Sequence, residues 1–282
     1  MFQSLKFIWK HPISSRNRGA SLTRWLRWQL GSRLLGHPVI YNWIGDAKLV
    51  METGMTGATG NLYCGLHEFV DMGFVLHFLR PSDGFADIGA NIGSYSVLAS
   101  AFIGAKTRAF EPHPETHRKL IRNVAINGIE DRVSAILGAV GRERGILKFT
   151  ADRDTMNQVV KNDYRGSTID VPVVRLDDAL EGFSAVLWKV DVEGYEEEVL
   201  EGAQVELGRA SLKALLLETE SPRILELLQT NGFERVHYDP FSRSFVKRSG
   251  KTEQNSLWIR DRPYCEDRLQ TAPRVTVAGV TF

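Results

Sequence analysis

The spacing of apolar and polar residues predicts alternating strands and helices through the middle of the chain. Between the predicted strands, apolar residues recur three and four positions apart, as in helices that bury one face. This alternation favours an α/β fold with a doubly wound, mostly parallel sheet. The apolar runs of strand length lie at residues 85–88, 107–110, 133–137, 185–190 and 212–217.

Segments outside this alternation predict additions to the sheet. Residues 233–238 and 256–260 are expected to form an antiparallel strand pair at one edge. Residues 146–175 hold strand-like pieces, which predict an insertion lying over one end of the sheet. Beyond Arg262 the chain is polar, and one further strand is expected at residues 274–282.

Ahead of the central alternation, short apolar pieces separated by glycines predict a small β-rich segment. Residues 38–65 are expected to form these strands, the last at 61–64, and residues 66–79 are expected to form a helix. The expected organisation is an N-terminal extension, a core and a tail, over residues 1–60, 61–262 and 263–282.

The N-terminal extension combines basic charge with an amphipathic helix. No acidic residue precedes Asp46. Such a helix either docks on the core with its arginines in solvent or lies on an anionic membrane. Both alternatives stay open here, and the membrane alternative is peripheral contact through residues 1–36. The helix is indicated by leucines at every fourth position, namely Leu22, Leu26, Leu30 and Leu34.

Composition narrows the function classes only slightly. The 282 residues are 43% hydrophobic and 24% charged, with a formal net charge of +1. This charge does not favour a nucleic-acid partner, and the core lacks a basic stripe that would follow phosphates. The two cysteines have neither metal-site nor disulfide spacing, which favours a reduced, cytoplasmic setting. Composition does not predict an oligomeric state.

A glycine-rich turn follows the first of the predicted parallel strands. It reads Asp87-Ile-Gly89-Ala-Asn91-Ile-Gly93, and the next strand ends at Glu111, 22 residues after Gly89. A strand that breaks at glycine into a helix is a nucleotide-binding device of open α/β sheets. An acid at the position of Glu111 can accept hydrogen bonds from ribose hydroxyls. By itself the turn fits S-adenosylmethionine, NAD or no ligand, although its spacing departs from the dinucleotide fingerprint.

Acidic side chains stand at the ends of four predicted strands. Because ligands of open α/β sheets bind at the carboxyl ends of the strands, these acids are candidate site residues. The alternative for any one of them is a loop carboxylate that accepts hydrogen bonds from nearby backbone N–H groups. The four residues are Asp87, Glu111, Asp191 and Glu218.

Three stretches together resemble the FkbM-type S-adenosylmethionine-dependent methyltransferases. They are Asp87-Ile-Gly-Ala-Asn-Ile-Gly93, Glu111-Pro-His-Pro114 and Trp188-Lys-Val-Asp-Val-Glu-Gly194. The resemblance covers roughly residues 63–260. It implies a Rossmann-like class I fold, S-adenosylmethionine as methyl donor, and O-methylation of a hydroxyl on a sugar, glycan or secondary metabolite.

The resemblance also implies individual cofactor contacts. Glu111 would hold the ribose hydroxyls, and Ala139 would border the adenine, where this chain has no acid to bind the adenine amine. Glu68 would face the methionine end of the cofactor; the alternative for Glu68 is a helix N-terminal charge favoured by the dipole. The cofactor loop would consist of Asp87, Gly89, Asn91 and Gly93.

Methyl transfer to a hydroxyl requires orientation and gains from a base that removes the proton. Asp191 is the first candidate, because it ends the fourth parallel strand, nearest the methyl group, where it would also border the cofactor. Glu193 and His113 are further candidates for the base.

The acceptor is expected to be a small molecule or a glycan, and its contacts are less defined. Asn157 and Tyr164 of the insertion, together with Glu218, are the polar side chains expected to contact it. Asp191, Glu193 and Glu218 offer the oxygen ligands that Mg²⁺ prefers, but no ligand spacing requires a metal. Two other functions stay open: an NAD-dependent oxidoreductase, and a non-catalytic module for partner or membrane binding.

Overall fold

The computed structural model describes residues 2–52, 55–150, 159, 164–247 and 255–282. Its centre is an eight-stranded sheet with the order β12-β11-β13-β10-β9-β3-β4-β5. The strands are β3 (Gly84–Ile88), β4 (Lys106–Glu111), β5 (Val133–Leu137), β9 (Ala185–Val190), β10 (Ala214–Leu217), β11 (Glu234–Asp239), β12 (Ser244–Val246) and β13 (Ser256–Ile259).

The strands from β10 to β5 run parallel, and β13 is antiparallel to both β10 and β11. This confirms the predicted doubly wound, mostly parallel sheet and its antiparallel C-terminal pair. The third strand at that edge, β12, pairs antiparallel with β11 and was not expected.

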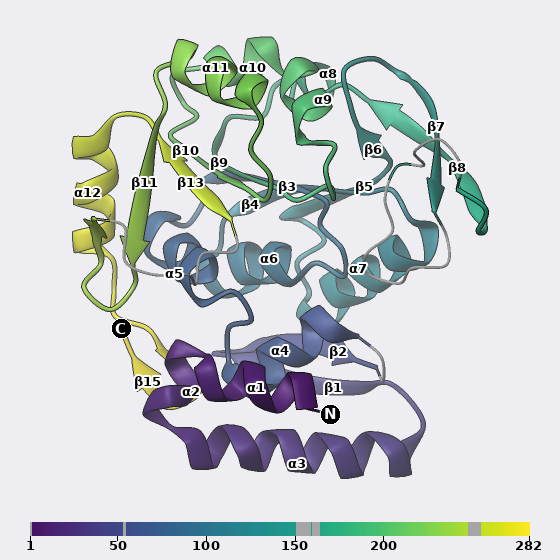
Figure 1. Ribbon diagram of the computed structural model, residues 1–282, viewed down its shortest axis with the longest axis vertical. Coiled ribbons are helices and arrows are strands. Elements are labelled where there is room, and N and C mark those ends of the chain that lie inside the picture. Colours follow the sequence, from purple (N-terminus) through teal and green to yellow (C-terminus); the bar gives the residue numbers. More distant parts are fainter. Residues whose placement is uncertain (1, 53–54, 151–158, 160–163, 248–254) are drawn as a thin grey trace.

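Helices cover both faces of the sheet (Figure 1). One face carries α5 (Phe69–Phe78), α6 (Ser94–Val97), the π-helical turn η1 (Leu98–Ile103) and α7 (Pro114–Asn127). The other carries α8 (Leu176–Ala179), α9 (Glu196–Glu201), α10 (Gln204–Gly208) and α11 (Pro222–Thr230).

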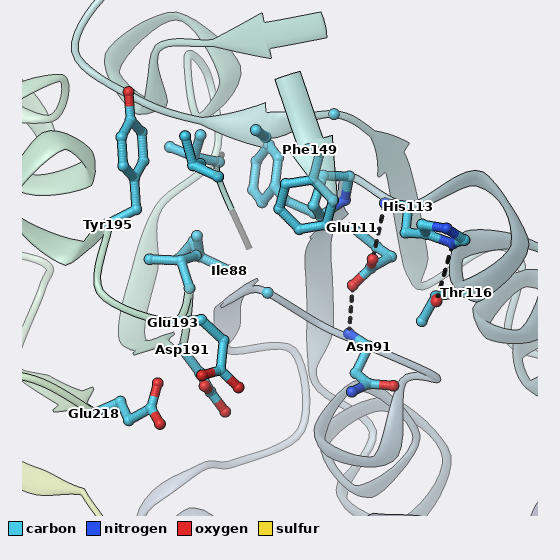
Figure 2. A pocket seen from close by; sticks show the side chains of 18 of the residues that line it. Ile88, Asn91, Glu111, His113, Thr116, Phe149, Asp191, Glu193, Tyr195 and Glu218 are labelled. Atoms are coloured by element: carbon cyan, nitrogen blue, oxygen red, sulfur yellow. Dashed lines mark hydrogen bonds between the residues drawn. The ribbon is translucent and has the colours of Figure 1, made fainter. Parts of the chain in front are cut away.

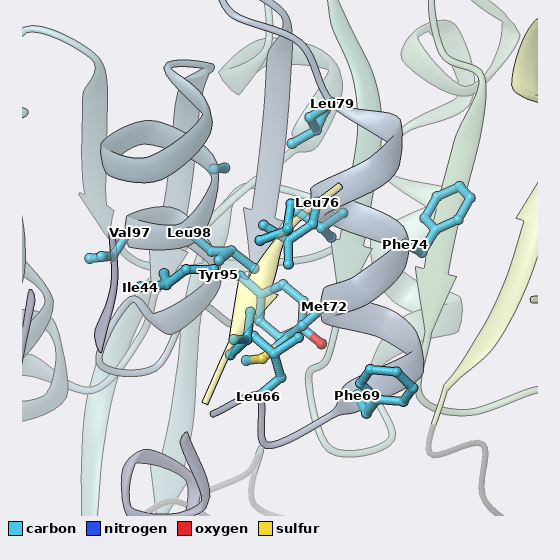
Figure 3. Packing of buried hydrophobic residues seen from close by; sticks show 14 of the residues in the cluster. Ile44, Leu66, Phe69, Met72, Phe74, Leu76, Leu79, Tyr95, Val97 and Leu98 are labelled. Carbon is cyan, nitrogen blue, oxygen red and sulfur yellow. The ribbon is translucent and has the colours of Figure 1, made fainter. Parts of the chain in front are cut away.

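Alternate side chains of the central strands supply the two hydrophobic cores. Ala214 and Leu216 point into the core beneath α5, whereas Leu215 and Leu217 point into the core beneath α9 and α11. This is the period of two that a strand imposes, and it explains why β10 is apolar throughout. Met72 and Leu76 of α5 lie against Tyr95 of α6 in the first core (Figure 3).

The N-terminal residues pack beneath this first helical layer (Figure 1). They form α1 (Phe2–Lys10), α2 (Pro12–Arg16), α3 (Arg18–Leu35), the hairpin of β1 (Val39–Ile44) and β2 (Ala47–Met51), and α4 (Thr56–Cys64). Ile8 and Ile13 are fully buried in the same cluster as the α5 side chains. The prediction of a strand at residues 61–64 was wrong, because these residues end α4.

The predicted N-terminal helix is present as α3, but of its four regularly spaced leucines Leu22 alone packs against the core. Trp25 and Trp28 pack against the core, whereas Leu26, Leu30 and Leu34 are exposed. Both sets recur three or four residues apart, so periodicity alone did not identify the face that packs inward.

The C-terminal tail differs from its prediction. A helix, α12 (Arg262–Thr271), covers one edge, and β14 (Thr276–Val277) with β15 (Val280–Thr281) forms a short hairpin instead of one strand. Only Cys265 and Leu269 of α12 are buried, so the helix lacks the apolar stripe that would have indicated it. Arg268 anchors it through ion pairing with Asp83.

The insertion predicted at residues 146–175 contributes to a separate three-stranded sheet with the order β6-β8-β7, in which β6 precedes the insertion. Its strands are β6 (Ala139–Val140), β7 (Gly145–Thr150) and β8 (Thr168–Val174). Val159 forms an isolated bridge with Phe149 and extends this sheet by one residue pair.

Candidate functional site

A cavity of about 270 Å³ lies at the carboxyl ends of the parallel strands. The chain runs from β3 to β4 and β5 on one side, and β9 and β10 lie on the other, so the order of strands reverses between β3 and β9. Ligands of open α/β sheets bind at such a reversal. A second hollow of about 100 Å³ shares Glu68, Gly89, Asn91 and Asp191 with the first, so the two form neighbouring lobes.

The glycine turn separates the two lobes, and its backbone explains its sequence. Gly89, Asn91 and Gly93 all have positive φ, at 80°, 53° and 85°. A Cβ on Gly89 would lie 1.8 Å from the carbonyl oxygen of Asp191, so glycine is required for β3 to approach β9. Asparagine is among the residues that best tolerate a left-handed conformation, which fits Asn91.

Glu111 holds the turn through both of its carboxylate oxygens. Oε2 accepts a hydrogen bond from the Asn91 N–H at 2.9 Å, and Oε1 accepts one from the His113 N–H at 2.9 Å (Figure 2). Burial raises the pKa of Glu111 to about 7, although these N–H groups act in the opposite direction. Each oxygen retains a further lone pair, so Glu111 can still accept hydrogen bonds from a ligand in the cavity.

Asp87 lies beneath the turn and is completely buried. Its Oδ2 accepts a hydrogen bond from Ser96 Oγ at 2.6 Å, and its Oδ1 has no partner among the described residues. Burial raises the pKa of Asp87 to about 6, against the opposing effect of Lys189. A ligand in the second lobe that carries a hydrogen-bond donor would supply the missing partner of this oxygen.

Lys189 supplies the positive charge of the site, and the sequence analysis gave it no role of its own. Its side chain is 3% exposed, forms an ion pair with Asp191 and lies 4.7 Å from the centre of the Tyr95 ring. Burial alone would lower the pKa of Lys189, but Asp191, Glu68 and Asp87 together raise it above its ordinary value. A lysine in the middle of an otherwise apolar strand was the available signal.

Asp191, Glu193 and Glu218 gather at the ends of β9 and β10 (Figure 2). Each offers a carboxylate oxygen, and the three oxygens lie within 4.8 Å of one another. Burial would raise the pKa of Asp191, but Lys189 more than offsets this and holds it below its ordinary value. Burial and the charge of Asp191 raise the pKa of Glu218 to about 8, so the pair shares a proton near neutral pH.

A buried glutamate holds the loop that carries Glu193. Glu196 is almost inaccessible, and its Oε1 accepts hydrogen bonds from the N–H groups of Val192 and Gly194, both at 3.3 Å. Glu193 itself has a φ of 53°, an uncommon conformation for a side chain of its size. Its pKa is raised by burial and by Asp191. The loop is therefore fixed so that Glu193 borders the cavity.

The structure separates His113 from the three carboxylates. His113 lies beside Glu111 at the start of α7, across the cavity from Asp191 (Figure 2). Its Nδ1 is 3.5 Å from Thr116 Oγ1. His113 still lines the cavity, but at the Glu111 side, where the sequence analysis had placed the ribose.

The remaining predicted site residues are Ala139, Tyr164, Asn157 and Glu68. Ala139 lines it together with Phe149 of β7, an apolar contact that the sequence analysis missed. Tyr164 is half-buried but is not among the described residues that line the cavity. Asn157 lies outside the described residues. Glu68 lines both lobes and accepts a hydrogen bond from the Tyr95 hydroxyl.

The three gathered carboxylates are also the group that could hold a divalent cation. Their oxygens are the ligands that Mg²⁺ prefers. Lys189, however, already supplies one positive charge to Asp191 through the ion pair. A cation at this position would therefore compete with a lysine that is fully buried beneath it.

Comparison with known proteins agrees with this geometry. Residues 87–249 match the family model described as the methyltransferase FkbM domain. Methyltransferase sdnD of Sordaria araneosa is 30% identical over 195 residues, which are 55% of this chain and 75% of that protein. The 31-O-demethyl-FK506 methyltransferase FkbM of Streptomyces tacrolimicus is 28% identical over 173 residues, which are 48% of this chain and 66% of that protein.

Solved structures resemble the chain more distantly. The TrmK protein of M. capricolum in complex with S-adenosyl-homocysteine is 11% identical, with a TM-score of 0.40 over 67% of this chain and 66% of that one. Precorrin-6y C5,15-methyltransferase of Geobacter metallireducens is 13% identical, with a TM-score of 0.41 over 69% and 87%. Alignments at this level carry no weight for function, and the fold is established by the strand order of the chain itself.

The matched domain begins at Asp87 in the glycine turn and includes the acids that end β4, β9 and β10. It covers more than half of the 282 residues. Membership also points to S-adenosylmethionine as the methyl donor. The chain is a methyltransferase and belongs to the FkbM methyltransferase family.

Proposed function

We propose that this enzyme transfers a methyl group from S-adenosylmethionine to a hydroxyl oxygen of a sugar, a glycan or a secondary metabolite. One observation carries the proposal: Asp191, Glu193 and Glu218 bring their carboxylate oxygens within 4.8 Å of one another in the same cavity that Glu111 and Asn91 line. The name of the Streptomyces tacrolimicus relative, a 31-O-demethyl-FK506 methyltransferase, also supports an oxygen acceptor.

The residues of the two lobes fit this cofactor. Glu111 has lone pairs left for the ribose hydroxyls, and Ala139 with Phe149 offers an apolar border for the adenine. The second lobe offers Glu68 and the unpaired Oδ1 of Asp87 to a cationic amino group at the methionine end. When bound, the cofactor supplies an electrophilic methyl group.

The Asp191–Glu218 pair would accept the proton of the hydroxyl. Lys189 keeps Asp191 ionised, and Asp191 in turn keeps Glu218 protonated near neutral pH. As the pH rises through about 8, the pair loses its shared proton and can take one from the acceptor. A catalytic base works best with a pKa near the working pH, which favours this pair over an isolated Asp191.

Ligand-dependent thermal stability tests the cofactor assignment. A ligand at 100 times its dissociation constant adds about 2.7 kcal/mol to the free energy of unfolding. We expect S-adenosylmethionine and S-adenosylhomocysteine to raise the melting temperature and NAD to leave it unchanged. Stabilisation by NAD alone would contradict the proposal.

Product mass analysis tests the acceptor class. The enzyme is offered a panel of hydroxyl-bearing sugars and macrolides and, as a matched control, the same compounds with the hydroxyl replaced by an amine. We expect methylated products only from compounds that carry the hydroxyl. Methylation of the amine compounds alone would remove O-methylation as the function and leave the cofactor assignment standing.

A further inference from the structure

The outer face of α3 is apolar and exposed, which is unusual for a helix packed on a protein core. Leu26, Leu30 and Leu34 lie four residues apart on one side of the helix and are 51%, 56% and 85% exposed. We call these three side chains the leucine face. In Figure 1, α3 lies along the outer edge of the molecule, beyond α1 and α2.

The orientation of α3 is fixed by polar contacts on its inner side. The Arg24 guanidinium donates hydrogen bonds to the carbonyl oxygens of Leu62 and Tyr63, at 3.1 and 2.8 Å. Gln29 Nε2 donates to the Tyr63 hydroxyl at 3.1 Å. Rotating the helix to bury the leucines would break these bonds and expose Trp25 and Trp28, so the leucine face is a stable feature of the fold.

The surroundings of the leucine face are basic. Arg27 and Arg33 lie on either side of it by helical spacing, and both are exposed. No acidic residue precedes Asp46 in the sequence. Apolar side chains flanked by arginines are typical of helices that lie in the interface of an anionic membrane.

Further exposed apolar side chains lie in the same N-terminal region. Among the described residues, six of the ten exposed large apolar side chains precede residue 41, and three of them are those of the leucine face. The other three are Trp9, Leu35 and Ile40. Apolar exposure is therefore concentrated in the segment of the chain that carries no negative charge.

From this arrangement we propose that α3 docks the enzyme on the surface of an anionic lipid bilayer, with the leucine face inserted among the lipids. A second copy of the chain is the main alternative occupant. A two-fold contact would place the same patch of both copies together and bring their arginines close, with no acid before Asp46 to pair with them. Anionic lipid headgroups supply the negative charge that a second copy lacks.

None of the helices in the described residues is long and apolar enough to cross a bilayer. The proposed geometry is a helix that lies along the interface. Deleting residues 1–36 would not test it, because Ile8 and Ile13 are fully buried in the core and the deletion would disturb the fold.

Co-sedimentation of the full-length protein with vesicles tests the proposal. We expect binding at low salt to vesicles of phosphatidylcholine mixed with phosphatidylglycerol, and binding at least about tenfold weaker to phosphatidylcholine alone. The variants Leu30→Asp and Leu34→Asp should each reduce binding about tenfold or more. Both side chains are exposed, so the variants should melt like the parent protein.

A matched control and an oligomer measurement make the test decisive. Ile121→Asp also places an acid at an exposed apolar position of a helix, α7, and should leave vesicle binding unchanged. Equal binding to neutral vesicles would overturn the choice of an anionic surface. Failure to bind anionic vesicles would overturn lipid docking, and a dimer in sedimentation equilibrium that Leu34→Asp dissociates would assign the face to a second copy.

Discussion

Glu111 and Asp191 are both carboxylates at the carboxyl ends of parallel strands in one cavity, yet they are held by different means. Among the described residues, the partners of the Glu111 carboxylate are backbone N–H groups, and burial raises its pKa to about 7. Asp191 has the buried Lys189 as counter-ion, which holds its pKa below the ordinary value. Environment thus assigns different tasks to like residues: Glu111 orders the turn, and Asp191 carries a permanent charge.

Among the changes that test this comparison of Glu111 with Asp191, removal of the Lys189 ammonium group is expected to have the largest effect. Lys189→Met leaves the buried Asp87 and the half-buried Asp191 without positive charge, and we expect the free energy of unfolding to fall by about 3–5 kcal/mol. Urea denaturation of the parent and variant measures this. The control is Lys213→Met, whose exposed ion pair with Asp261 should cost about 1 kcal/mol or less. Equal losses for the two variants would show that Lys189 is not the counter-ion of the site.

Removing the charge on Asp191 is expected to have the largest effect on turnover. Asp191→Asn should lower turnover about 10²-fold or more, because without the charge of Asp191 the pKa of Glu218 falls and the remaining carboxylate is a weaker base. Affinity for S-adenosylhomocysteine should change by less than about 1 kcal/mol, since an amide still offers an acceptor.

The folded fraction of Asp191→Asn must be measured alongside its turnover, because Lys189 loses its ion-pair partner. Asp178→Asn, which removes a carboxylate from an exposed pair with Arg144, is the matched control. Adding a chelator and then Mg²⁺ to the parent enzyme shows whether the carboxylates act through a metal. Full turnover in the folded Asp191→Asn variant would exclude Asp191 as part of the base.

At the Glu111 side of the cavity, we expect a substitution to change the affinity for the cofactor instead of the turnover. Glu111→Ala removes the acceptor for two backbone N–H groups and, on our proposal, for the ribose hydroxyls, so it should weaken cofactor binding by about 1–3 kcal/mol. Calorimetry with S-adenosylhomocysteine measures the change. Glu115→Ala, at an exposed position of α7, is the control. Unchanged affinity in folded Glu111→Ala would remove this residue from the cofactor site.

The pH dependence of turnover tests the Asp191 side of the cavity without a substitution. The pKa of Glu218 is raised to about 8, so the pair holds its shared proton below that pH and loses it above. Turnover should therefore rise roughly tenfold per pH unit below about 8 and level off above it. A pH–rate profile measures this, and Glu218→Gln should remove the inflection. A profile identical in both enzymes would assign the titration to another group.

Much of the fold and half of the site followed from local sequence. The five parallel strands were found because each is rich in apolar residues, most clearly β9 and β10, whose side chains are buried almost throughout. The glycine turn and Glu111 were found because a positive φ and a strand-end acid are local requirements that particular residues meet. The helix α12 was missed because only two of its side chains are buried, which leaves hardly any periodicity to detect.

Tertiary structure decided which side chains come into contact. Periodicity in the sequence identifies the two faces of a helix or strand, but it does not show what packs against each face. Lys189 became the counter-ion of Asp191 because β9 lies between β3 and β10, where the lysine is almost completely buried beside Asp191. His113 stands at the start of α7, near Thr116, and therefore lies across the cavity from Asp191. On α3, the sequence places both the leucines and the pair Trp25 and Trp28 at helical spacing. Packing of Leu22, Trp25 and Trp28 against the core left Leu26, Leu30 and Leu34 outside. The same orientation brings Arg24 to the carbonyl oxygens at the end of α4.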